Sequence, residues 1–256
     1  MAGSLRKTGL SILADLPWGS HFSLFYQTKQ DLLDAIVPFL KAGLDSNELC
    51  LWVISKDQPL TIEEASCAIP RTRNLEILSH EEWFGDPFDF PRVVGLVKDK
   101  LGQALAKGCA GLRLNGSSAW LQKEQWEHFQ AFEGTLDGSL ADEPLLVLCN
   151  FQLVTINASE FIDAASAHHF TLVRRNGVWQ TILLGDPPTR VHSLTPRELD
   201  VLTWVARGKT ASEIGEILGI TKRTVDEHVQ TAVRKLGAAN RTQAVVRALV
   251  HKIIEV

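Results

Sequence analysis

Apolar residues between positions 20 and 182 fall into two alternating patterns. Short, nearly continuous apolar runs of the kind found in buried strands are separated by longer segments whose apolar residues recur every three or four positions. The runs predict strands over 20–26, 48–55, 75–79, 111–114 and 145–153, and the periodic segments predict helices over 30–43, 91–107, 122–137 and 159–167. This alternation is typical of an α/β domain whose mainly parallel sheet is covered by helices on both faces. The stretch 169–182 predicts an antiparallel hairpin at one edge, turning at Asn176-Gly177.

Residues 193–256 show a different pattern, with a helical period throughout and frequent helix-start signals. Helices are expected to begin at four capping residues, Thr195, Thr210, Thr221 and Asn240, and to end near Gly208, Gly219 and Gly237. Only Gly219-Ile220 separates the second helix from the third, which is the short connection that a helix-turn-helix requires. We therefore predict an all-α domain of four helices, joined to an α/β domain at 18–183 by a linker over 184–192 that contains two prolines.

The third of these helices has two distinct faces. One face is an apolar stripe of Val225, Val229, Ala232 and Leu236, and the opposite face carries Arg223, Glu227, Gln230 and Arg234. The spacing alone also fits a plain helical hairpin with a solvated charged face. The charge distribution favours a nucleic-acid partner, because residues 190–256 hold 11 Lys and Arg against 7 Asp and Glu, whereas residues 1–189 hold 15 against 23.

The composition is that of a soluble globular protein. The chain is 45% hydrophobic and 22% charged, and it has no apolar run long enough to cross a membrane. The first 17 residues lack the unbroken apolar core and the cleavage site of a signal peptide, so a cytoplasmic location is expected. The four cysteines are 17, 42 and 40 positions apart, and the adjacent His168 and His169 would point to opposite faces of a strand, so we predict no metal site.

The four-helix segment closely resembles a known family. The matching residues include Leu194-Thr195-Pro196-Arg197-Glu198, Gly208-Lys209-Thr210, Glu213-Ile214, Thr224-Val225, His228-Val229, Lys235-Leu236 and Asn240-Arg241. This string resembles the DNA-binding domain of the LuxR/FixJ family of bacterial transcription regulators. The resemblance implies that the third helix enters the major groove of double-stranded DNA, and that the chain is a regulator and not an enzyme.

The same resemblance implies roles for individual residues. Asp226, Glu227 and Gln230 occupy the base-reading positions, where carboxylates accept from cytosine and Gln pairs with adenine, although either acid could instead face solvent. The candidate phosphate contacts are Lys222, Arg223, Thr224, Arg234 and Lys235, with Thr210 at the start of the preceding helix. In this family the fourth helix helps to pair two copies, so we expect a homodimer on two half-sites.

The start of the α/β domain is similar to RecA/KaiC-like nucleotide-binding domains, in which a strand, a turn, a helix and a second strand follow one another. The segment Tyr26-Gln27-Thr28-Lys29-Gln30, where a phosphate-binding loop would lie, holds no glycine. Gly208-Lys209-Thr210 lacks the upstream glycine of a P-loop. An ATPase is therefore the alternative that the sequence favours least, and no cofactor is expected.

The α/β segment also resembles the MEDS sensory domain, a family named for methanogens, methylotrophs and a dichloromethane-responsive regulator. The matching residues include His21-Phe22-Ser23-Leu24-Phe25-Tyr26, Pro38-Phe39-Leu40, Glu48-Leu49-Cys50-Leu51-Trp52-Val53, Glu82-Trp83, Leu112-Arg113-Leu114 and His168-His169. The resemblance implies a degenerate RecA-like fold that senses a small, hydrocarbon-derived ligand. The alternative is a protein-interaction module that binds another regulator.

Ligands of open α/β sheets settle beyond the carboxyl ends of the strands. Tyr26, His80 and Asn150 lie at or just after such ends, and Trp83 and Trp120 follow closely enough to form an aromatic wall. His21 and Arg113 lie within strands and could point into the same space. These seven residues are the predicted contacts of a small, largely apolar effector, and the alternative for each of them is packing in the core.

Overall fold

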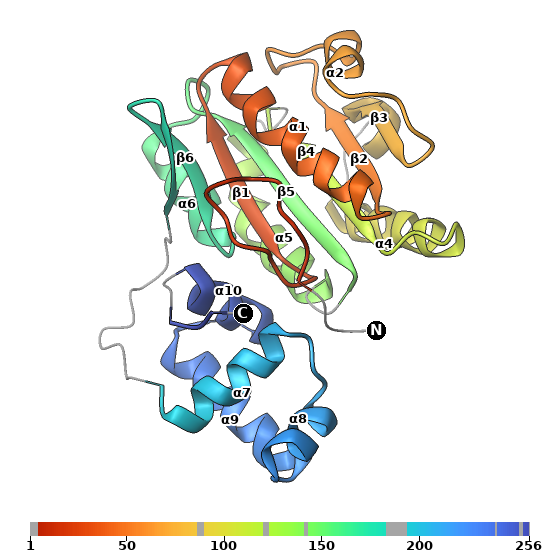
Figure 1. The fold of residues 1–256 in the computed structure, drawn as a ribbon. Helices are drawn as coiled ribbons and strands as arrows, with labels where there is room; N and C mark the ends of the chain where they lie inside the picture. The colour runs from red at the N-terminus through yellow and green to blue at the C-terminus, as the bar shows by residue number, and fades with distance from the viewer. Residues whose placement is uncertain are drawn as a thin grey trace.

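The computed structural model describes residues 5–85, 90–119, 123–140, 143–182, 194–238, 240–250 and 253–255. Within these ranges the chain forms an α/β domain followed by a bundle of helices (Figure 1). The predicted linker over 184–192 lies outside the described residues. No helix in the described ranges has the length and apolar character needed to span a membrane.

The α/β domain is built on one sheet of seven strands. The strands are β1 (His21–Tyr26), β2 (Leu49–Ile54), β3 (Leu75–Ser79), β4 (Leu112–Ser117), β5 (Leu145–Gln152), β6 (Thr171–Arg175) and β7 (Val178–Ile182). They lie in the order β3-β2-β4-β5-β1-β6-β7, and every neighbouring pair is parallel except the β6–β7 hairpin. The predicted mainly parallel sheet with an antiparallel edge is confirmed. The hairpin turns at Asn176 and Gly177, whose φ angles of 53° and 77° suit an Asn-Gly turn.

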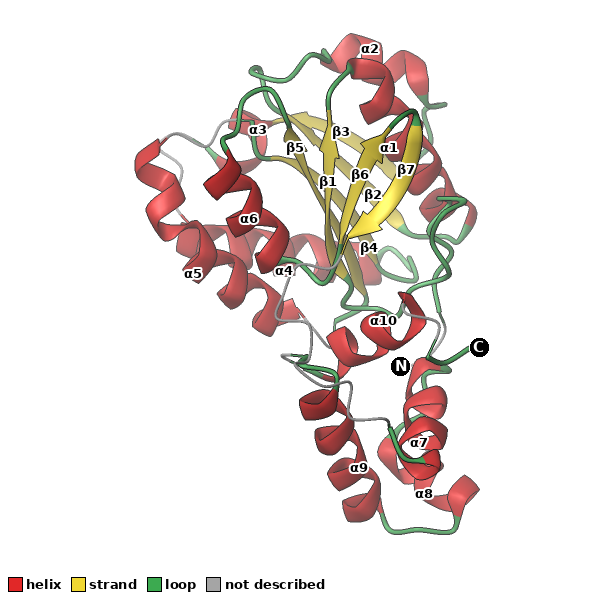
Figure 2. Ribbon diagram, turned by 90° about the vertical axis from the view of Figure 1, so that its left-hand side faces the viewer, coloured by secondary structure: helices red, strands yellow, loops and turns green. Residues whose placement is uncertain are grey.

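Helices cover both faces of this sheet, as Figure 2 shows. They are α1 (Lys29–Asp45), α2 (Ile62–Ala68), α3 (His80–Phe84), α4 (Phe90–Ala106), α5 (Lys123–Leu140) and α6 (Ala158–Ala167). Side chains alternate between the two faces along each strand. On β1, Phe22, Leu24 and Tyr26 pack into the core beneath α1, whereas Phe25 packs with Phe129 of α5. The face covered by α1 and the face covered by α5 are therefore two separate packing layers.

Helices α2 and α3 are absent from the pattern-based prediction because each is too short to show an apolar period. Both begin with a capping box, in which a side-chain hydroxyl accepts from a backbone amide and a carboxylate accepts from the cap residue. The pairs are Thr61 with Glu64 and Ser79 with Glu82. These capping pairs were the sequence signal that could have located the two helices.

The C-terminal helices are α7 (Pro196–Ala206), α8 (Ala211–Leu218), α9 (Lys222–Lys235) and α10 (Arg241–Val250), and the predicted four-helix domain is confirmed. Thr195 and Thr210 form capping boxes at the starts of α7 and α8. Gly219 ends α8 with a left-handed φ of 66°, the conformation that a helix end favours at glycine. Val201, Leu202 and Val225 lie in a hydrophobic core that these helices share.

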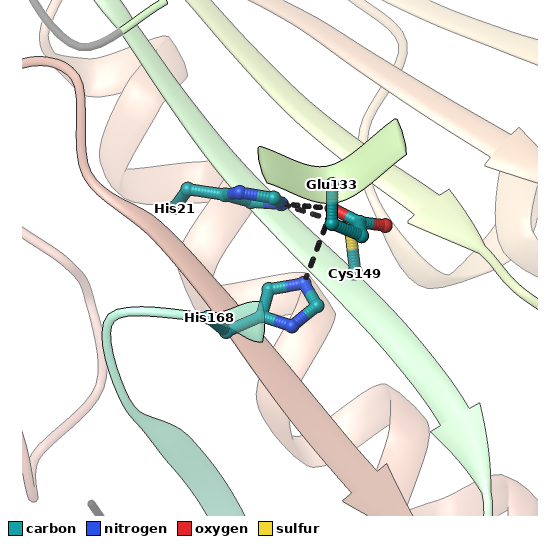
Figure 3. Close-up of side chains that lie close together, drawn as sticks. All are labelled: His21, Glu133, Cys149 and His168. Atoms are coloured by element: carbon teal, nitrogen blue, oxygen red, sulfur yellow. Dashed lines mark hydrogen bonds and ion pairs between the residues drawn. The ribbon is translucent and has the colours of Figure 1, made fainter. Parts of the chain in front are cut away.

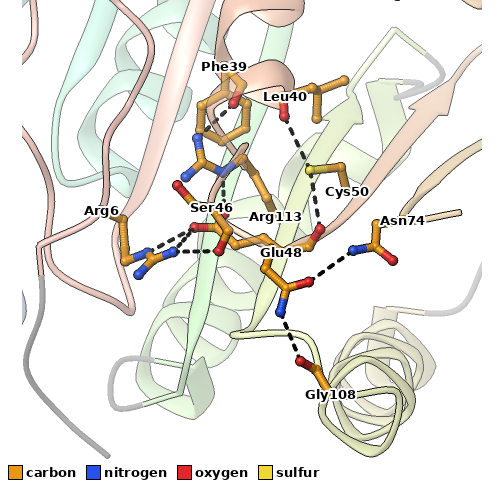
Figure 4. A network of polar contacts seen from close by, with 10 residues as sticks. Arg6, Phe39, Leu40, Ser46, Glu48, Cys50, Asn74, Gly108 and Arg113 are labelled. Carbon is orange, nitrogen blue, oxygen red and sulfur yellow. Dashed lines mark hydrogen bonds and ion pairs between the residues drawn. The ribbon is translucent and has the colours of Figure 1, made fainter. Parts of the chain in front are cut away.

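A buried ion pair connects α1, β2 and β4 on one face of the sheet (Figure 4). Arg113 on β4 donates through Nε to Glu48 Oε2 at 2.6 Å and through Nη1 to the carbonyl of Phe39 at 2.7 Å. Glu48 also pairs with Arg6 at 2.8 Å. The side chains of Glu48 and Arg113 are completely buried, so the charge of Arg113 depends on Glu48 for compensation, whereas Glu48 is also paired with Arg6.

We expect Glu48→Gln to lower the free energy of unfolding of the full chain by about 3–5 kcal/mol, because it leaves the Arg113 guanidinium buried without a counter-charge. Urea unfolding followed by tryptophan fluorescence measures this loss. Lys29→Ala is the control, since Lys29 pairs with Glu64 at the exposed surface and should leave the unfolding midpoint unchanged. Equal effects of the two substitutions would contradict the assigned role of the buried pair.

Candidate DNA interface and ligand site

Helices α8 and α9 approach each other closely at the three-residue connection 219–221. A Cβ atom at Gly215 of α8 would lie 2.7 Å from the carbonyl oxygen of Ile220, which is tighter than real Cβ atoms allow. Glycine at this position therefore permits the close crossing of the two helices. Val225 of α9 is fully buried in the crossing, so the rotation of α9 about its axis is fixed.

The predicted base-reading face of α9 points to solvent. Asp226, Glu227 and Gln230 are exposed, as are the basic side chains of Lys222, Arg223 and Arg234. In Figure 2 the start of α9 lies at the end of the molecule farthest from the sheet. Nothing in the described part of the chain covers this face, so its polar side chains are accessible to a partner.

Four of the predicted DNA contacts, Arg223, Thr224, Glu227 and Arg234, already make side-chain hydrogen bonds within α9 or to its cap residue. Arg223 Nε donates to Glu227 Oε1 at 3.0 Å, one helical turn away. The hydroxyls of Thr221 and Thr224 lie 2.8 Å apart, and Thr221 Oγ1 also accepts from the amide of Thr224 as the helix cap. These arrangements lie at the surface, where water competes for the hydrogen bonds, so exchange for a DNA contact costs little.

Thr210 and Lys235 hold structural positions within the helical domain. Thr210 caps α8, and its hydroxyl and amide donate to Glu213 at 2.9 and 2.8 Å, which lowers the pKa of Glu213 to about 2. Lys235 donates to both oxygens of Glu198, at 2.7 and 3.0 Å, and connects the end of α9 to the start of α7. Burial alone would raise the pKa of Glu198, but the hydrogen bonds from Lys235 and from the amide of Thr195 outweigh it and hold the pKa low.

Helix α10, for which sequence reasoning predicted a dimer surface, is buried within its own chain. Ala244, Val245, Ala248 and Leu249 belong to the core of the helical domain. Val246 packs instead into the core of the α/β domain. These apolar residues of α10 are therefore covered by the helical bundle and, at Val246, by the α/β domain.

The start of α1, where a nucleotide-binding domain would bind phosphate, contains an internal anion. Asp31 accepts from the amides of Gln27 and Thr28 at 3.2 and 3.1 Å and pairs with Arg174 at 2.7 Å. Burial would raise the pKa of Asp31, but the hydrogen bonds from Thr28, Gln27 and Arg174 lower it. The backbone amides that would bind a phosphate in a P-loop therefore have a carboxylate of this chain as their partner.

The predicted ligand residues do not form one pocket. Tyr26 lies in the core beneath α1, and burial raises the pKa of its hydroxyl. Asn150 donates to Asn115 Oδ1 at 3.2 Å and to the carbonyl of Gly116 at 2.9 Å. Arg113 belongs to the ion pair with Glu48 described above. These three side chains are tied into the interior of the sheet.

The other predicted residues lie elsewhere. Trp83 packs in the core beneath α4, and His80 lies against the ring of Phe84, with the ring centres 4.8 Å apart. His21 faces α5, on the side of the sheet opposite Arg113, because it occupies the alternate position along its strand. Trp120 lies outside the described residues.

A cavity of about 60 Å³ lies between α4, α5 and strands β4 and β5. Most of its lining is apolar, and its polar groups include the carboxyl of Glu133 and the thiol of Cys149; its lining residues are Phe84, Val93, Val97, Leu114, Gly116, Ser117, Ser118, Phe129, Phe132, Glu133, Leu136, Leu140, Val147 and Cys149. None of the six predicted ligand contacts that the structure describes lines it.

A cluster of titratable side chains lies next to this cavity (Figure 3). His21 Nε2 is 3.4 Å from Glu133 Oε2 and 3.4 Å from Cys149 Sγ, and His168 Nε2 is 4.0 Å from Glu133 Oε2. Burial lowers the pKa of His21 and that of His168, the latter to about 4. Burial also raises the pKa of Glu133 to about 8 and that of Cys149. At neutral pH these four side chains are therefore mostly uncharged.

His169 connects this cluster to the helical domain. Its Nδ1 accepts from the amide of His21 at 3.3 Å, so its proton lies on Nε2, which is 2.6 Å from Asp137 Oδ1. The other oxygen of Asp137 accepts from Asn240 Nδ2 at 3.1 Å. Asn240 also accepts from the amide of Gln243 at 2.9 Å, at the first turn of α10. A continuous polar path therefore runs from β1 to the start of α10.

Comparison with known proteins agrees with this division of the chain. The sequence model of the MEDS domain, described as the methanogen/methylotroph, DcmR sensory domain, matches residues 20–169, more than half of the chain. The chain belongs to the MEDS family. The model of bacterial regulatory proteins of the luxR family matches residues 192–248, so a luxR-type DNA-binding domain follows the MEDS domain.

Curated relatives are transcription regulators. The chain is 62% identical over 72 residues to the transcriptional activator protein BjaR1 of Bradyrhizobium diazoefficiens, covering 28% of this chain and 30% of the relative. It is 57% identical over 67 residues to the quorum sensing-dependent regulator RpaR of Rhodopseudomonas palustris, covering 26% and 28%. The chain thus spans less than a third of the length of these relatives. Among solved structures, the flagellar accessory protein FlaH of Methanocaldococcus jannaschii matches with a TM-score of 0.41 and 10% identity, over 70% of this chain and 85% of that one.

Sequence reasoning missed most of the cluster beside the cavity. It selected His21 as a ligand contact, assigned no role to Glu133, and set Cys149 and His168 aside when it predicted no metal site. That prediction placed His168 and His169 in a strand, whereas both precede β6, and His168 is the residue that ends α6. Cys149 is 128 positions from its neighbour His21, and no local spacing motif connects the two. Only the pairing of the strands brings these residues together.

We expect Glu198→Gln to lower the free energy of unfolding by roughly 1–2 kcal/mol at neutral pH, because it removes the charge that Lys235 pairs with in a site only partly screened by water. Gln at this position can still complete the capping box of α7, so the substitution isolates the ion pair. Denaturant unfolding followed by far-ultraviolet circular dichroism measures the change.

The difference in unfolding free energy between wild type and Glu198→Gln should decrease as the pH falls. The pKa of Glu198 is lowered in the folded chain, so its contribution is complete above the ordinary carboxyl value of about 4.3 and declines as the pH falls through the lowered value. The unfolding free energies of wild type and Glu198→Gln should therefore become equal at low pH. Glu227→Gln, which removes an exposed pair with Arg223, is the matched control and should match wild type at every pH. A constant difference down to low pH would refute the role of the ion pair.

Proposed function

We propose that this chain is a transcription regulator that binds double-stranded DNA through α9 and changes that binding when its MEDS domain senses a small molecule in the cytoplasm. The exposed polar face of α9 carries the proposal. The tight crossing with α8 fixes the orientation of this helix, and its exposed basic and acidic side chains suit the major groove of DNA. The luxR-type match over the same helices supports it. The proposal includes two copies pairing on two half-sites.

Side-chain chemistry divides the contacts on α9 into two groups. Lys222 and Arg234 are exposed cations that suit phosphates, which fix the position of a protein on the duplex without reading its sequence. Gln230 is exposed one turn further along the helix than Asp226, and its amide suits the donor and acceptor pair of adenine. Asp226 has no hydrogen-bond partner among the contacts of the described residues and is available to accept from cytosine.

The cavity beneath α4 and α5 is the best-supported effector site. Its lining is mostly apolar, and apolar cavities of this kind stay dry and take up compact apolar molecules. Its volume of about 60 Å³ is well below the roughly 150 Å³ that accommodates benzene, so it suits a ligand of only a few heavy atoms. Glu133 and Cys149 provide polar groups that would fix the orientation of the ligand.

For DNA binding, we expect Lys222→Ala and Arg234→Ala to weaken binding to all duplex sequences alike and to reduce its salt dependence, because each removes a phosphate contact. Gln230→Ala should instead relax the preference at one base position, by about 1–3 kcal/mol. Selection of bound duplexes from a random pool by the full chain, followed by titrations at several salt concentrations, measures both effects.

Arg71→Ala is the control for these substitutions, since it removes an exposed cation of the MEDS domain, far from α9 along the chain. It should leave affinity and base preference unchanged. If none of the three α9 substitutions changed the selected sequence or the affinity, this face would not bind DNA and the proposed function would be wrong.

For the effector cavity, we expect xenon to bind to the wild-type protein between α4 and α5, because xenon occupies small dry apolar cavities. Val97→Phe should abolish xenon binding by filling the space, since Val97 is buried and lines the cavity. Leu105→Phe, on the exposed side of the same helix, should have no effect. Xenon-pressurised crystals or xenon-dependent chemical shifts give the occupancy. Absence of xenon from wild type would exclude this cavity as the effector site.

A further inference from the structure

We propose that His21, Glu133, Cys149 and His168 form a binding site for a divalent transition-metal ion of the zinc class. The four side chains come from β1, α5, β5 and the end of α6, and Figure 3 shows them converging on one point. Their donor atoms are two imidazole nitrogens, one carboxylate oxygen and one thiol sulfur. The site is separate from the DNA interface, and two of its four residues, Glu133 and Cys149, also line the proposed effector cavity.

The distances suit a tetrahedral ion. Zinc bonds of about 2.0–2.3 Å place neighbouring ligand atoms of a tetrahedron roughly 3.3–3.8 Å apart. His21 Nε2 lies 3.4 Å from both Glu133 Oε2 and Cys149 Sγ, and His168 Nε2 lies 4.0 Å from Glu133 Oε2. All four donor atoms lie within 4.8 Å of one another. The widest of these separations would have to shorten by about 1 Å to reach tetrahedral values, which requires small rotations of the side chains.

The histidine His168 is oriented as a metal ligand would be. Its Nδ1 lies 2.6 Å from the carbonyl oxygen of Ala164, and because a carbonyl can only accept, Nδ1 carries the proton. Nε2 therefore presents its lone pair to the cluster. Metal-bound histidines typically donate their second ring nitrogen to a carbonyl or carboxylate in this way, which fixes both the tautomer and the ring orientation.

Several of the donor atoms lack hydrogen bonds although they are buried. Glu133 Oε2 and His168 Nε2 have no hydrogen-bond partner among the described residues, and Glu133 is only 3% exposed. Buried polar atoms normally have hydrogen-bond partners. When several such atoms without partners converge on one point, they indicate a binding site for a ligand. A cation would satisfy the carboxylate and imidazole together.

The charges also balance. A divalent ion bound by a thiolate, a carboxylate and two neutral imidazoles gives a centre with no net charge, which suits a buried position. Binding forms four metal–ligand bonds, breaks the S–H bond of Cys149 and the O–H bond of Glu133, and releases two protons to solvent. A donor set of imidazole and thiolate in tetrahedral geometry favours zinc over magnesium or calcium, which prefer oxygen ligands.

The test uses the full chain, stripped of metal by a chelator under reducing conditions. Titration with zinc against a chromophoric chelator should show one tight ion per chain, confirmed by elemental analysis after dialysis. Substitution with cobalt should give a thiolate-to-cobalt charge-transfer band and visible bands of tetrahedral intensity. Cys149→Ser should remove the charge-transfer band, and His168→Gln should weaken zinc binding by more than about 100-fold.

Matched controls separate this site from other cysteines and histidines. Cys67→Ser changes an exposed cysteine and His228→Gln a histidine of α9, and both should bind zinc and cobalt like wild type. If a site variant fails to fold, X-ray absorption on zinc-loaded wild type should still show one sulfur at about 2.3 Å and nitrogen or oxygen ligands at about 2.0–2.1 Å. Absence of a stoichiometric ion, a charge-transfer band that survives in Cys149→Ser, or a zinc spectrum without sulfur would each overturn the proposal.

Discussion

Strand β1 lies between β5 and β6, and this pairing determines where the polar groups of the MEDS domain lie. Ser23 is in register with Cys149 on one side and with Thr171 on the other. Side chains alternate along a strand, so His21 and Cys149 project to the same face, toward α5. The amide of His21 donates to His169, whose own amide donates to the carbonyl of His21. Because β1 pairs with β5 and lies next to β6, His21 on β1 lies close to Cys149 on β5 and to His169 just before β6.

Buried titratable groups have different partners on the two faces of the sheet. On the α1 face, Arg113 donates to Glu48 through Nε and to the Phe39 carbonyl through Nη1, so the expense of burying the two charges is offset within the fold, although Arg113 Nη2 has no partner among the described residues. On the α5 face, Glu133 faces two imidazoles without a hydrogen bond to its Oε2 atom. The first arrangement has the features of a structural ion pair, whereas the second retains the capacity to bind something else. This difference separates Arg113 from His21, although sequence reasoning gave both the same role.

Local signals in the sequence predicted the elements well, because strand runs, helical periods and caps act over a few residues. The parallel sheet, the Asn176-Gly177 hairpin and the four C-terminal helices all follow from such signals. The ligand site could not be predicted in the same way. Whether Tyr26 or Glu133 faces a cavity depends on strand order and on how α5 packs, and the pairing of β1 with β5 joins residues more than a hundred positions apart. Lys235 illustrates the same limit, since its partner Glu198 is 37 positions away.

Helix α10 is where the MEDS domain and the luxR-type domain meet. Val246 packs into the core of the MEDS domain, and Asn240, at the first turn of α10, donates to Asp137 of α5. Asp137 also contacts His169, which is bonded to the backbone of His21. A shift of α5 or β1 on ligand binding would therefore change the support of α10 directly, without passing through the linker. Because Val246 packs against the MEDS domain, the surface of α10 around this residue is not available to a second copy while this contact is in place.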